Sequence, residues 1–302
     1  MSIDKSTAIV TADWTPAACK LNLCLHINQQ RTDGYHELQS LFQLIAFGDR
    51  LRVEPLNASD GSIEVSWISG RVNTDAQPKA ADDLLFKAAR ILQAQAPNPL
   101  PAVRIVLEKN APIGGGLGGG SAAAATALHL LNHVWSLDCT TDGLAELGLA
   151  LGADVPFFVH GHTAMVHGVG EVITPCTLPE RWFVLAVPTL AISTASLFAD
   201  PTLNRHSPKV QDQTLINNWQ TAGWNDFEPV VLQRHPELAQ IAAVMDQICG
   251  FARLTGTGGC LFAPANSEEQ AQQWAKQLET HSSKLQACHA VRGLNRFAPL
   301  PQ

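Results

Sequence analysis

Six glycines occur among the seven residues from Gly114 to Gly120, and an alanine-rich run follows them directly. Inside a helix or strand each glycine costs about 0.5–1 kcal/mol relative to alanine, so this segment predicts a turn. Ser121 and the alanines after it favour a helix from about Ser121 to Trp135. The free N–H groups and the positive dipole end of a helix N-terminus bind phosphate. The segment therefore predicts a phosphate site at a strand-to-helix turn.

Three kinds of phosphate-binding motif compete for this segment, which we call the glycine loop (Pro112 to Ser121). Glycines 114, 116 and 119 satisfy GxGxxG, but four residues separate the turn from the preceding strand, where a dinucleotide-binding turn would follow the strand directly. A Walker A loop requires a lysine where this chain has Gly120. The third motif is the loop of small-metabolite kinases, with a proline before Gly-Leu-Gly and a serine after it. This motif fits best, and a turn without a ligand would need fewer glycines.

The rest of the chain predicts mixed helices and strands without strict βαβ alternation, which favours a two-domain α+β fold. The domain boundary is expected near residues 162–180. Asp82 is the expected cap of the first long helix, and Thr140 or Thr141 caps a later one. Expected strands cover residues 20–27, 51–53, 63–68, 103–107, 181–188 and 260–263, and expected helices cover 82–95, 121–135, 141–151, 236–250 and 267–278.

Composition excludes several classes of protein. The 302 residues carry a formal charge of −7 without a basic stripe, so no nucleic-acid partner is expected. Seven widely spaced cysteines indicate free thiols in a reducing cytoplasm. No apolar stretch is long enough to span a membrane, and the first ten residues, MSIDKSTAIV, do not form a signal peptide. A cytoplasmic protein without a membrane partner, monomeric or weakly homodimeric, is expected.

Several segments together resemble the GHMP superfamily of small-molecule kinases. Within it, the block DGYHELQSLFQ is similar to the members that phosphorylate a cytidine diphosphate conjugate of methylerythritol. The matching segments are residues 19–51, the glycine loop, LGADVPFFVHG from Leu151, GVGE from Gly168, NDFEPV from Asn225, LTGTGG from Leu254 and RGLNRFAPL from Arg292.

The resemblance implies a fold and a reaction. Residues 1–165 would form an N-terminal domain of the ribosomal-protein-S5-like type with a left-handed βαβ unit, and residues 166–291 a ferredoxin-like C-terminal domain. Residues 292–302 would return to the first domain. The implied reaction transfers the γ-phosphate of ATP, with Mg²⁺, to the 2-hydroxyl of the cytidyl conjugate, in the non-mevalonate route to isoprenoids. How the protein holds Mg²⁺ is left open, and the histidines at 129, 133, 160, 162 and 167 are not interpreted as a metal site.

Two alternatives remain. Another superfamily kinase, acting on homoserine, mevalonate or a sugar, would share the glycine loop, but the DGYHELQ block argues against it. A catalytically inactive nucleotide-binding homologue is opposed by the retained Lys20 and Asp154.

The resemblance also assigns roles at the acceptor end of the site. The proton acceptor of the family falls on Asp154, and Lys20 would keep it ionised and stabilise charge on the phosphoryl group. Asn22 would orient the acceptor hydroxyl or the lysine. The cytidine site falls on Tyr35 and His36, with Thr194 as a further substrate contact.

At the nucleotide end, the resemblance places the ATP phosphates on the glycine loop. Lys109 would reach the nucleotide, and Asp83 and Leu84 would lie near the adenine. Thr255 to Gly259, the second glycine turn, would close over the site. The expected loop residues are Pro112, Gly114, Gly115, Gly116, Leu117, Gly118, Gly119, Gly120 and Ser121.

Three departures from the family pattern are visible. Ala17 to Cys19 precede Lys20 without the usual proline. Ala122 and Ala123 follow Ser121 where a serine and a polar residue are usual, and Asp83 replaces an asparagine.

Overall fold

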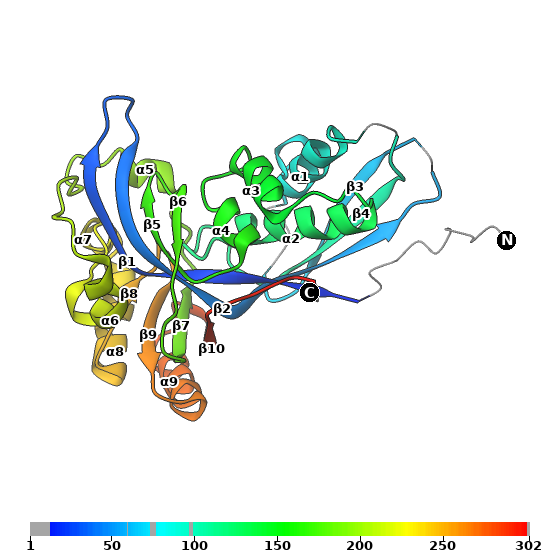
Figure 1. Cartoon of the computed structure of the whole chain (residues 1–302). Helices are drawn as coiled ribbons and strands as arrows, with labels where there is room; N and C mark the ends of the chain where they lie inside the picture. Colours follow the sequence, from blue (N-terminus) through cyan, green and yellow to red (C-terminus); the bar gives the residue numbers. More distant parts are fainter. Residues whose placement is uncertain (1–12, 59, 73–76, 97–98, 301–302) are drawn as a thin grey trace.

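The computed structural model describes residues 13–58, 60–72, 77–96 and 99–300 (Figure 1). Residues 1–10, for which no signal peptide is expected, lie outside the described residues. Among the described helices, none is both long and apolar enough to cross a membrane. The strands are β1 (Thr15–Gln30), β2 (His36–Pro55), β3 (Ile63–Ser69), β4 (Val103–Lys109), β5 (Ala164–Gly168), β6 (Val172–Pro175), β7 (Trp182–Pro188), β8 (Arg253–Leu254), β9 (Leu261–Ala265) and β10 (Leu285–Leu294). The helices are η1 (Ala80–Asp82), α1 (Leu84–Gln93), α2 (Gly119–Val134), α3 (Thr141–Leu149), α4 (Val155–His160), α5 (Thr194–Phe198), α6 (Asp212–Ala222), α7 (Glu228–Arg234), α8 (Pro236–Cys249) and α9 (Glu268–His281).

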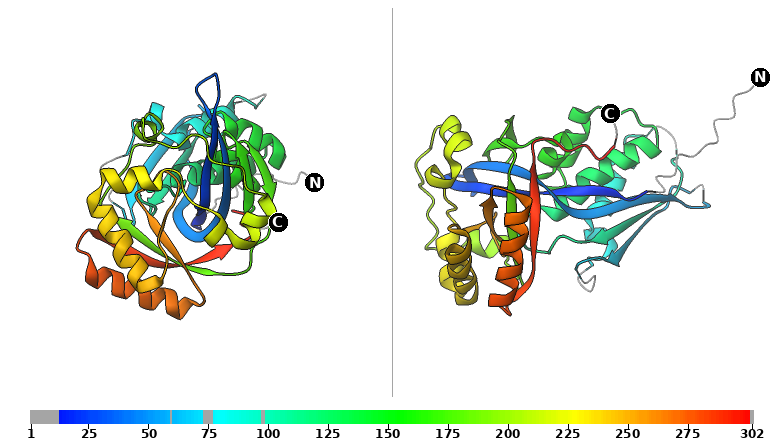
Figure 2. Two further views of the ribbon diagram at one scale, coloured as in Figure 1. Left: turned by 90° about the vertical axis from the view of Figure 1, so that its left-hand side faces the viewer. Right: turned by 90° about the horizontal axis from the view of Figure 1, so that it is seen from below.

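Two long antiparallel strands, β1 and β2, run through the whole molecule (Figure 2, right). They span 16 and 20 residues and join at a turn whose Gly34 has φ +89°. The register shifts three times along the pair, and such bulges re-aim individual side chains. Residues Ala17 to Ile27 are buried throughout, because other elements cover both faces of β1. The two strands therefore form a common spine for both halves of the fold.

The first half packs helices α1 to α4 against the end of the sheet that β2, β3 and β4 form (Figure 1). β3 and β4 are parallel neighbours joined through η1 and α1, whereas β2 and β4 are antiparallel. Leu44, Ile105, Leu128 and Phe157 are fully buried between the sheet and these helices. This core fixes the start of α2 and the start of α4 beside β1.

The second half packs α7, α8 and α9 on a sheet that contains β7, β9 and β10. Val184, Leu238 and Leu261 are buried there. Leu25 and Ile27 of β1 belong to this second core, although β1 begins in the first half. The division of the chain at residue 165 stays a prediction.

The final segment of the described chain leaves the second half and contacts the first. Gly293 and Leu294 of β10 pair with Ile45 and Leu44 of β2. Beyond the strand, the Phe297 N–H donates to the carbonyl of Gly161 at 2.8 Å. β10 therefore belongs to both halves, pairing with β7 as well as with β2.

Several expected element boundaries differ from the structure. Asp82 is not the cap of α1: Asp83 is, with its side chain accepting from the Leu85 N–H at 2.8 Å. α2 begins at Gly119, two residues before the expected start, because Gly118 takes the left-handed conformation and ends the loop there. Thr140, one of two expected caps, does cap α3. Most of β2 was not expected, because its apolar run lacks clean alternation.

The contact of the final segment with the first half can be tested at Gly161. This glycine has φ +63°, and a Cβ added to it would lie 1.9 Å from the Phe297 carbonyl oxygen. Gly161→Ala should lower the free energy of unfolding by about 1–2 kcal/mol, because alanine is strained in the left-handed conformation, and by a further amount because the added methyl group displaces Phe297. Gly250→Ala is the control, since Gly250 has φ +70° but nothing within 4 Å of the added carbon. Urea unfolding of both variants should show the larger loss for Gly161→Ala. Equal losses would mean that the contact with Phe297 contributes nothing.

Candidate active site

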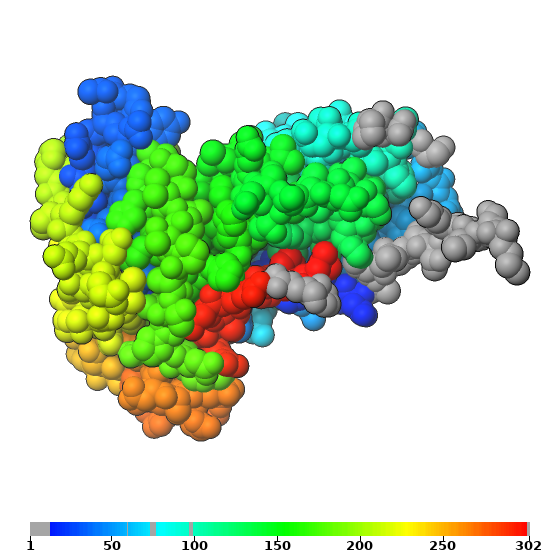
Figure 3. Space-filling model, in the orientation of Figure 1, coloured from blue at the N-terminus to red at the C-terminus, as the bar shows by residue number. Residues whose placement is uncertain are grey.

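A cavity of about 670 Å³ lies between the glycine loop, β1 and β2, and the starts of α4 and α5. Figure 3 shows a notch in the molecular outline between the blue tip of the β1–β2 hairpin and the green helices of the first half. The volume is in the range typical of small-molecule sites. The lining includes most of the residues that the sequence singled out: Lys20, Asn22, Asp83, Leu84, Lys109, Asp154, Thr194, Pro112 and every residue from Gly114 to Ser121.

The glycine loop needs its glycines for two physical reasons. Gly114, Gly116 and Gly118 have φ of +69°, +76° and +69°, a region that other residues rarely adopt. A Cβ on Gly116 would lie 2.0 Å from the carbonyl oxygen of Thr255, and one on Gly118 would lie 2.8 Å from the Phe158 ring. The loop therefore combines left-handed backbone with very close packing, and it leads directly into the N-terminus of α2.

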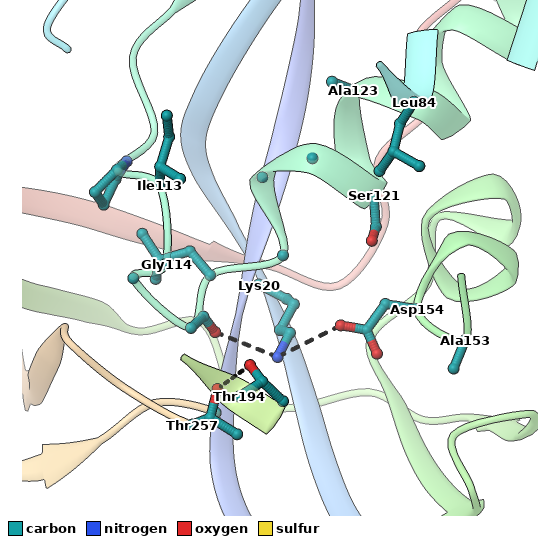
Figure 4. A pocket seen from close by; sticks show the side chains of 18 of the residues that line it. Lys20, Leu84, Ile113, Gly114, Ser121, Ala123, Ala153, Asp154, Thr194 and Thr257 are labelled. Atoms are coloured by element: carbon teal, nitrogen blue, oxygen red, sulfur yellow. Dashed lines mark hydrogen bonds and ion pairs between the residues drawn. The ribbon is translucent and has the colours of Figure 1, made fainter. Parts of the chain in front are cut away.

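The second glycine turn lies directly against the glycine loop. The Gly116 carbonyl accepts from the Thr255 hydroxyl at 3.3 Å, and the Cys260 N–H donates to the Gly115 carbonyl at 3.2 Å. Thr255 also accepts from the backbone N–H of Asn22 at 2.9 Å. Thr257 in this turn exchanges a 2.7 Å hydrogen bond with Thr194 at the start of α5 (Figure 4).

Lys20 projects from β1 into the centre of the cavity (Figure 4). Its Nζ lies 3.8 Å from Asp154 Oδ2 and 3.3 Å from the Gly116 carbonyl, and it also donates to Asn22 Oδ1. Asn22 in turn donates to the Ser40 hydroxyl at 2.9 Å. One ammonium group thus contacts both the glycine loop and Asp154.

Asp154 presents a partly exposed carboxylate to the cavity. It precedes α4 at the cap position, yet its side chain makes no capping hydrogen bond. The carboxylate is 32% exposed, whereas the Lys20 side chain is 5% exposed. Burial lowers the pKa of Lys20, and the charge of Asp154 partly opposes that fall.

Lys109 is held by a buried carboxylate that the sequence reading missed. Its Nζ lies 2.6 Å from Asp49 Oδ2, and both side chains are less than 5% exposed. The other oxygen, Oδ1, accepts from the backbone N–H groups of Asn110 and Ala111, each at 2.7 Å. Asp49 thereby binds the strand end, the lysine and the entry to the glycine loop. A Cβ on Gly119 would lie 3.6 Å from the Lys109 ammonium, so the pair sits under the first residue of α2.

Asp83 and Leu84 line one end of the cavity; in Figure 4, Leu84 lies above Lys20, and Thr194 at the start of α5 lies below it. Burial raises the pKa of Asp83, and hydrogen bonds from Leu85 and Trp67 oppose the rise. The Trp67 indole N–H donates to Asp83 Oδ2 at 2.9 Å, and Trp67 also lines the cavity. This end offers an aromatic and aliphatic surface.

Tyr35 and His36 do not line the cavity. Tyr35 is 64% exposed at the tip of the β1–β2 hairpin. The His36 ring packs on Phe198, with ring centroids 4.8 Å apart, and Phe198 lines the cavity at the end of α5. Phe198 therefore connects the predicted cytidine residues to the cavity. No sequence motif singled it out.

The comparisons with known proteins agree on one family. Residues 83–162 match the GHMP kinases N terminal domain, and residues 206–284 match the GHMP kinases C terminal domain. The chain is 46% identical to the 4-diphosphocytidyl-2-C-methyl-D-erythritol kinase of Pasteurella multocida over 85% of its own length and 83% of the relative's. It is 42% identical to the kinase of the same name from Pseudomonas paraeruginosa, over 90% and 92% of the two lengths.

Solved structures give the same result. A crystal structure of 4-(cytidine 5'-diphospho)-2C-methyl-D-erythritol kinase superposes with a TM-score of 0.75 at 30% identity, covering 93% of this chain and 98% of the other. A homoserine kinase from Cytophaga hutchinsonii superposes with a TM-score of 0.66 at 14% identity, covering 94% of both chains, which shows a shared fold alone.

The fold and the site thus define a kinase of the GHMP class, and the predicted two-domain α+β kinase fold is confirmed. Such kinases take their phosphoryl group from ATP. Within this class, the chain belongs to the 4-diphosphocytidyl-2-C-methyl-D-erythritol kinase family.

Asp49→Asn should destabilise the protein by about 3–5 kcal/mol, because it leaves the buried Lys109 charge unpaired while keeping an acceptor oxygen for the two N–H groups. The double variant Asp49→Asn with Lys109→Met should regain most of that loss. Guanidinium unfolding of the two single variants and the double variant measures the coupling. A loss below about 1 kcal/mol for Asp49→Asn would contradict a desolvated pair.

Proposed function

We propose that this chain transfers the γ-phosphoryl group of ATP to the 2-hydroxyl of 4-diphosphocytidyl-2-C-methyl-D-erythritol, giving the 2-phosphate and ADP. The reaction belongs to the non-mevalonate route to isoprenoid precursors. The observation that supports it most is the position of Lys20, whose ammonium lies between Asp154 and the glycine loop in one cavity. A phosphoryl group held by the glycine loop would then lie beside the partly exposed carboxylate of Asp154.

Asp154 acts as the general base in this proposal. It takes the proton of the 2-hydroxyl as the hydroxyl oxygen forms its bond to the γ-phosphorus and the bond to ADP breaks. Lys20 lies 3.8 Å from the Asp154 carboxylate and stabilises the negative oxygens of the transferring group. Asn22 and the Gly116 carbonyl hold the Lys20 ammonium in place.

The glycine loop holds the ATP phosphates. Backbone N–H groups at the start of α2 and its positive dipole end face the cavity, and the Ser121 hydroxyl lines it as well. Lys109, fixed by Asp49, places a further positive charge beneath Gly119. The adenine is assigned to the end that Trp67, Asp83 and Leu84 line.

Mg²⁺ is proposed to enter with ATP. Among the described residues, no group of three or more histidine, cysteine, aspartate or glutamate side chains is arranged to hold a metal. Mg²⁺ usually takes one or two protein oxygens and completes its octahedron with phosphates and water. Ser121 and Asp154 line the cavity and offer such oxygens. The bound ion would neutralise phosphate charge.

The cytidine is assigned to the surface near the tip of the β1–β2 hairpin. Phe198 and the exposed ring of Tyr35 offer apolar faces for a pyrimidine, and His36 offers a hydrogen-bonding group. Thr194, hydrogen-bonded to Thr257, lies close to Lys20 (Figure 4) and begins the helix that ends at Phe198, so it is proposed to contact the substrate. The monomeric or weakly dimeric state and the cytoplasmic location stay predictions.

Asp154→Asn should lower kcat by roughly 10²–10⁴-fold, because the amide cannot accept the proton, while ATP affinity stays within a few-fold. ADP release with the cytidyl substrate measures kcat, and equilibrium dialysis measures ATP binding. Asp142→Asn is the control, since the Asp142 side chain is 94% exposed and is not in the cavity lining. Undiminished kcat in Asp154→Asn would remove Asp154 from the role of base.

The substrate assignment predicts a ranking. The wild-type protein should release ADP with 4-diphosphocytidyl-2-C-methyl-D-erythritol and at least about 10³-fold less efficiently, by kcat/KM, with homoserine or mevalonate, which cannot fill the cytidine surface. The same coupled assay tests all three compounds. Preferential use of homoserine or mevalonate would overturn the substrate assignment. No turnover with any of the compounds, together with intact ATP binding, would favour the inactive homologue.

A further inference from the structure

Arg205 lies in the loop between α5 and α6 and is fixed from several directions. Its Nη2 donates to the carbonyls of Phe198 at 2.8 Å and Asp200 at 2.7 Å, and its Nη1 donates to that of Leu203 at 3.1 Å. Of the two donors that remain, Nε–H points to the Nε2 atom of His36 at 3.3 Å, 169 residues away in sequence. The guanidinium thus binds the end of α5 to the start of β2.

This last contact determines which nitrogen of His36 carries the proton. A guanidinium has only donors, so the Nε2 atom that it contacts must accept. A neutral imidazole with an accepting Nε2 has its proton on Nδ1. In a doubly protonated ring, the His36 Nε2–H would face the Arg205 Nε–H, and the imidazolium cation would lie against the guanidinium cation. Burial lowers the pKa of His36, and the charge of Arg205 lowers it further, in agreement with a neutral ring.

The charged groups around the ring do not compete with Arg205. Glu37, the next residue along β2, is paired with Arg31 at 3.4 Å. Asp200, on the loop that packs here, is paired with Arg234. Gln30, opposite His36 on β1, is neutral. Arg205 is therefore the charged group that contacts the ring within the described part of the chain.

The Nδ1 atom of His36 is open to a ligand. Within the described residues it has no hydrogen-bond partner. It is also not one of the buried polar atoms that lack a partner, so Nδ1 itself is not fully buried. The ring itself is held by Phe198, which lines the cavity. A ligand that meets Nδ1 must offer an acceptor.

We propose that Arg205 is a positioning residue that holds His36 as the Nδ1–H tautomer, so that the site selects a pyrimidine with an acceptor at N3. The proposal rests on the proposed cytidyl substrate. Cytosine has an unprotonated N3 that can accept a hydrogen bond from the His36 Nδ1–H. Uracil carries a proton on N3, so its N3–H would face the Nδ1–H and no hydrogen bond could form. Without Arg205 the ring is free to take the other tautomer, which turns Nδ1 into an acceptor and removes the distinction.

The first measurement determines the His36 tautomer in the wild-type protein. Long-range nitrogen–proton spectra of the ¹⁵N-labelled wild type at pH 7 report the tautomer of each histidine, and His36→Gln identifies the His36 signals by their loss. The expected result is a neutral ring protonated at Nδ1. A ring protonated at Nε2, or at both nitrogens, overturns the proposal. This reading does not depend on activity.

The second measurement uses Arg205→Met, which keeps an apolar stem but has no donor. KM for the cytidyl substrate should rise about 10–100-fold, in line with the loss of a hydrogen bond to a fixed partner, while kcat and the KM for ATP stay within about threefold. The preference for the cytidine over the uridine conjugate should fall by about tenfold or more. The His36 signals should show Nε2–H or a mixture.

Arg234→Met is the matched control, because Arg234 pairs with Asp200 on the same loop but does not contact His36. It should leave both the His36 tautomer and the cytidine-to-uridine ratio unchanged. An equal change in both variants would reduce Arg205 to a structural support and overturn the proposal. If the wild type uses neither conjugate, the proposed function fails, whereas the wild-type tautomer still decides the role of Arg205.

Discussion

The carbonyl oxygen of Gly116 is the point where three distant segments of this chain meet. Lys20 from β1 and Thr255 from the second glycine turn both donate to it, and Asn22 donates its backbone N–H to the same Thr255. The two turns approach so closely that a methyl group on Gly116 would overlap the Thr255 carbonyl. This contact fixes the position of Lys20 relative to the glycine loop, and it holds the second glycine turn against that loop.

The sequence predicted the local chemistry of the loop better than its surroundings. Glycine density and the alanine run predicted both the turn and α2, because backbone freedom and helix propensity are local properties. Asp49 was missed because nothing in its neighbourhood signals that Lys109, 60 residues on, will be buried against it. Arg205 was missed for the same reason, since its partner His36 lies 169 residues away. The wrong cap at Asp82 arose from two adjacent aspartates: Asp82 ends η1, whereas Asp83 accepts from the Leu85 N–H.

The departures of this chain from its family pattern now have a structural setting. Ala122 and Ala123 are both 2% exposed and belong to the first core, so small apolar side chains fit tightly there. Ser121 retains a hydroxyl at the end of the loop, and Figure 4 shows it on the side of Asp154. Asp83 accepts from the Leu85 N–H with Oδ1 and from the Trp67 indole N–H with Oδ2, whereas an asparagine would place an NH2 donor at one of these two positions.

The long strands β1 and β2 have a mechanical consequence. Because β1 contributes Ala17 to the first core and Ile27 to the second, no flexible linker separates the two halves. Rotating one half against the other would require bending a continuous antiparallel strand pair. β1 and β2 therefore join the two halves as one continuous frame.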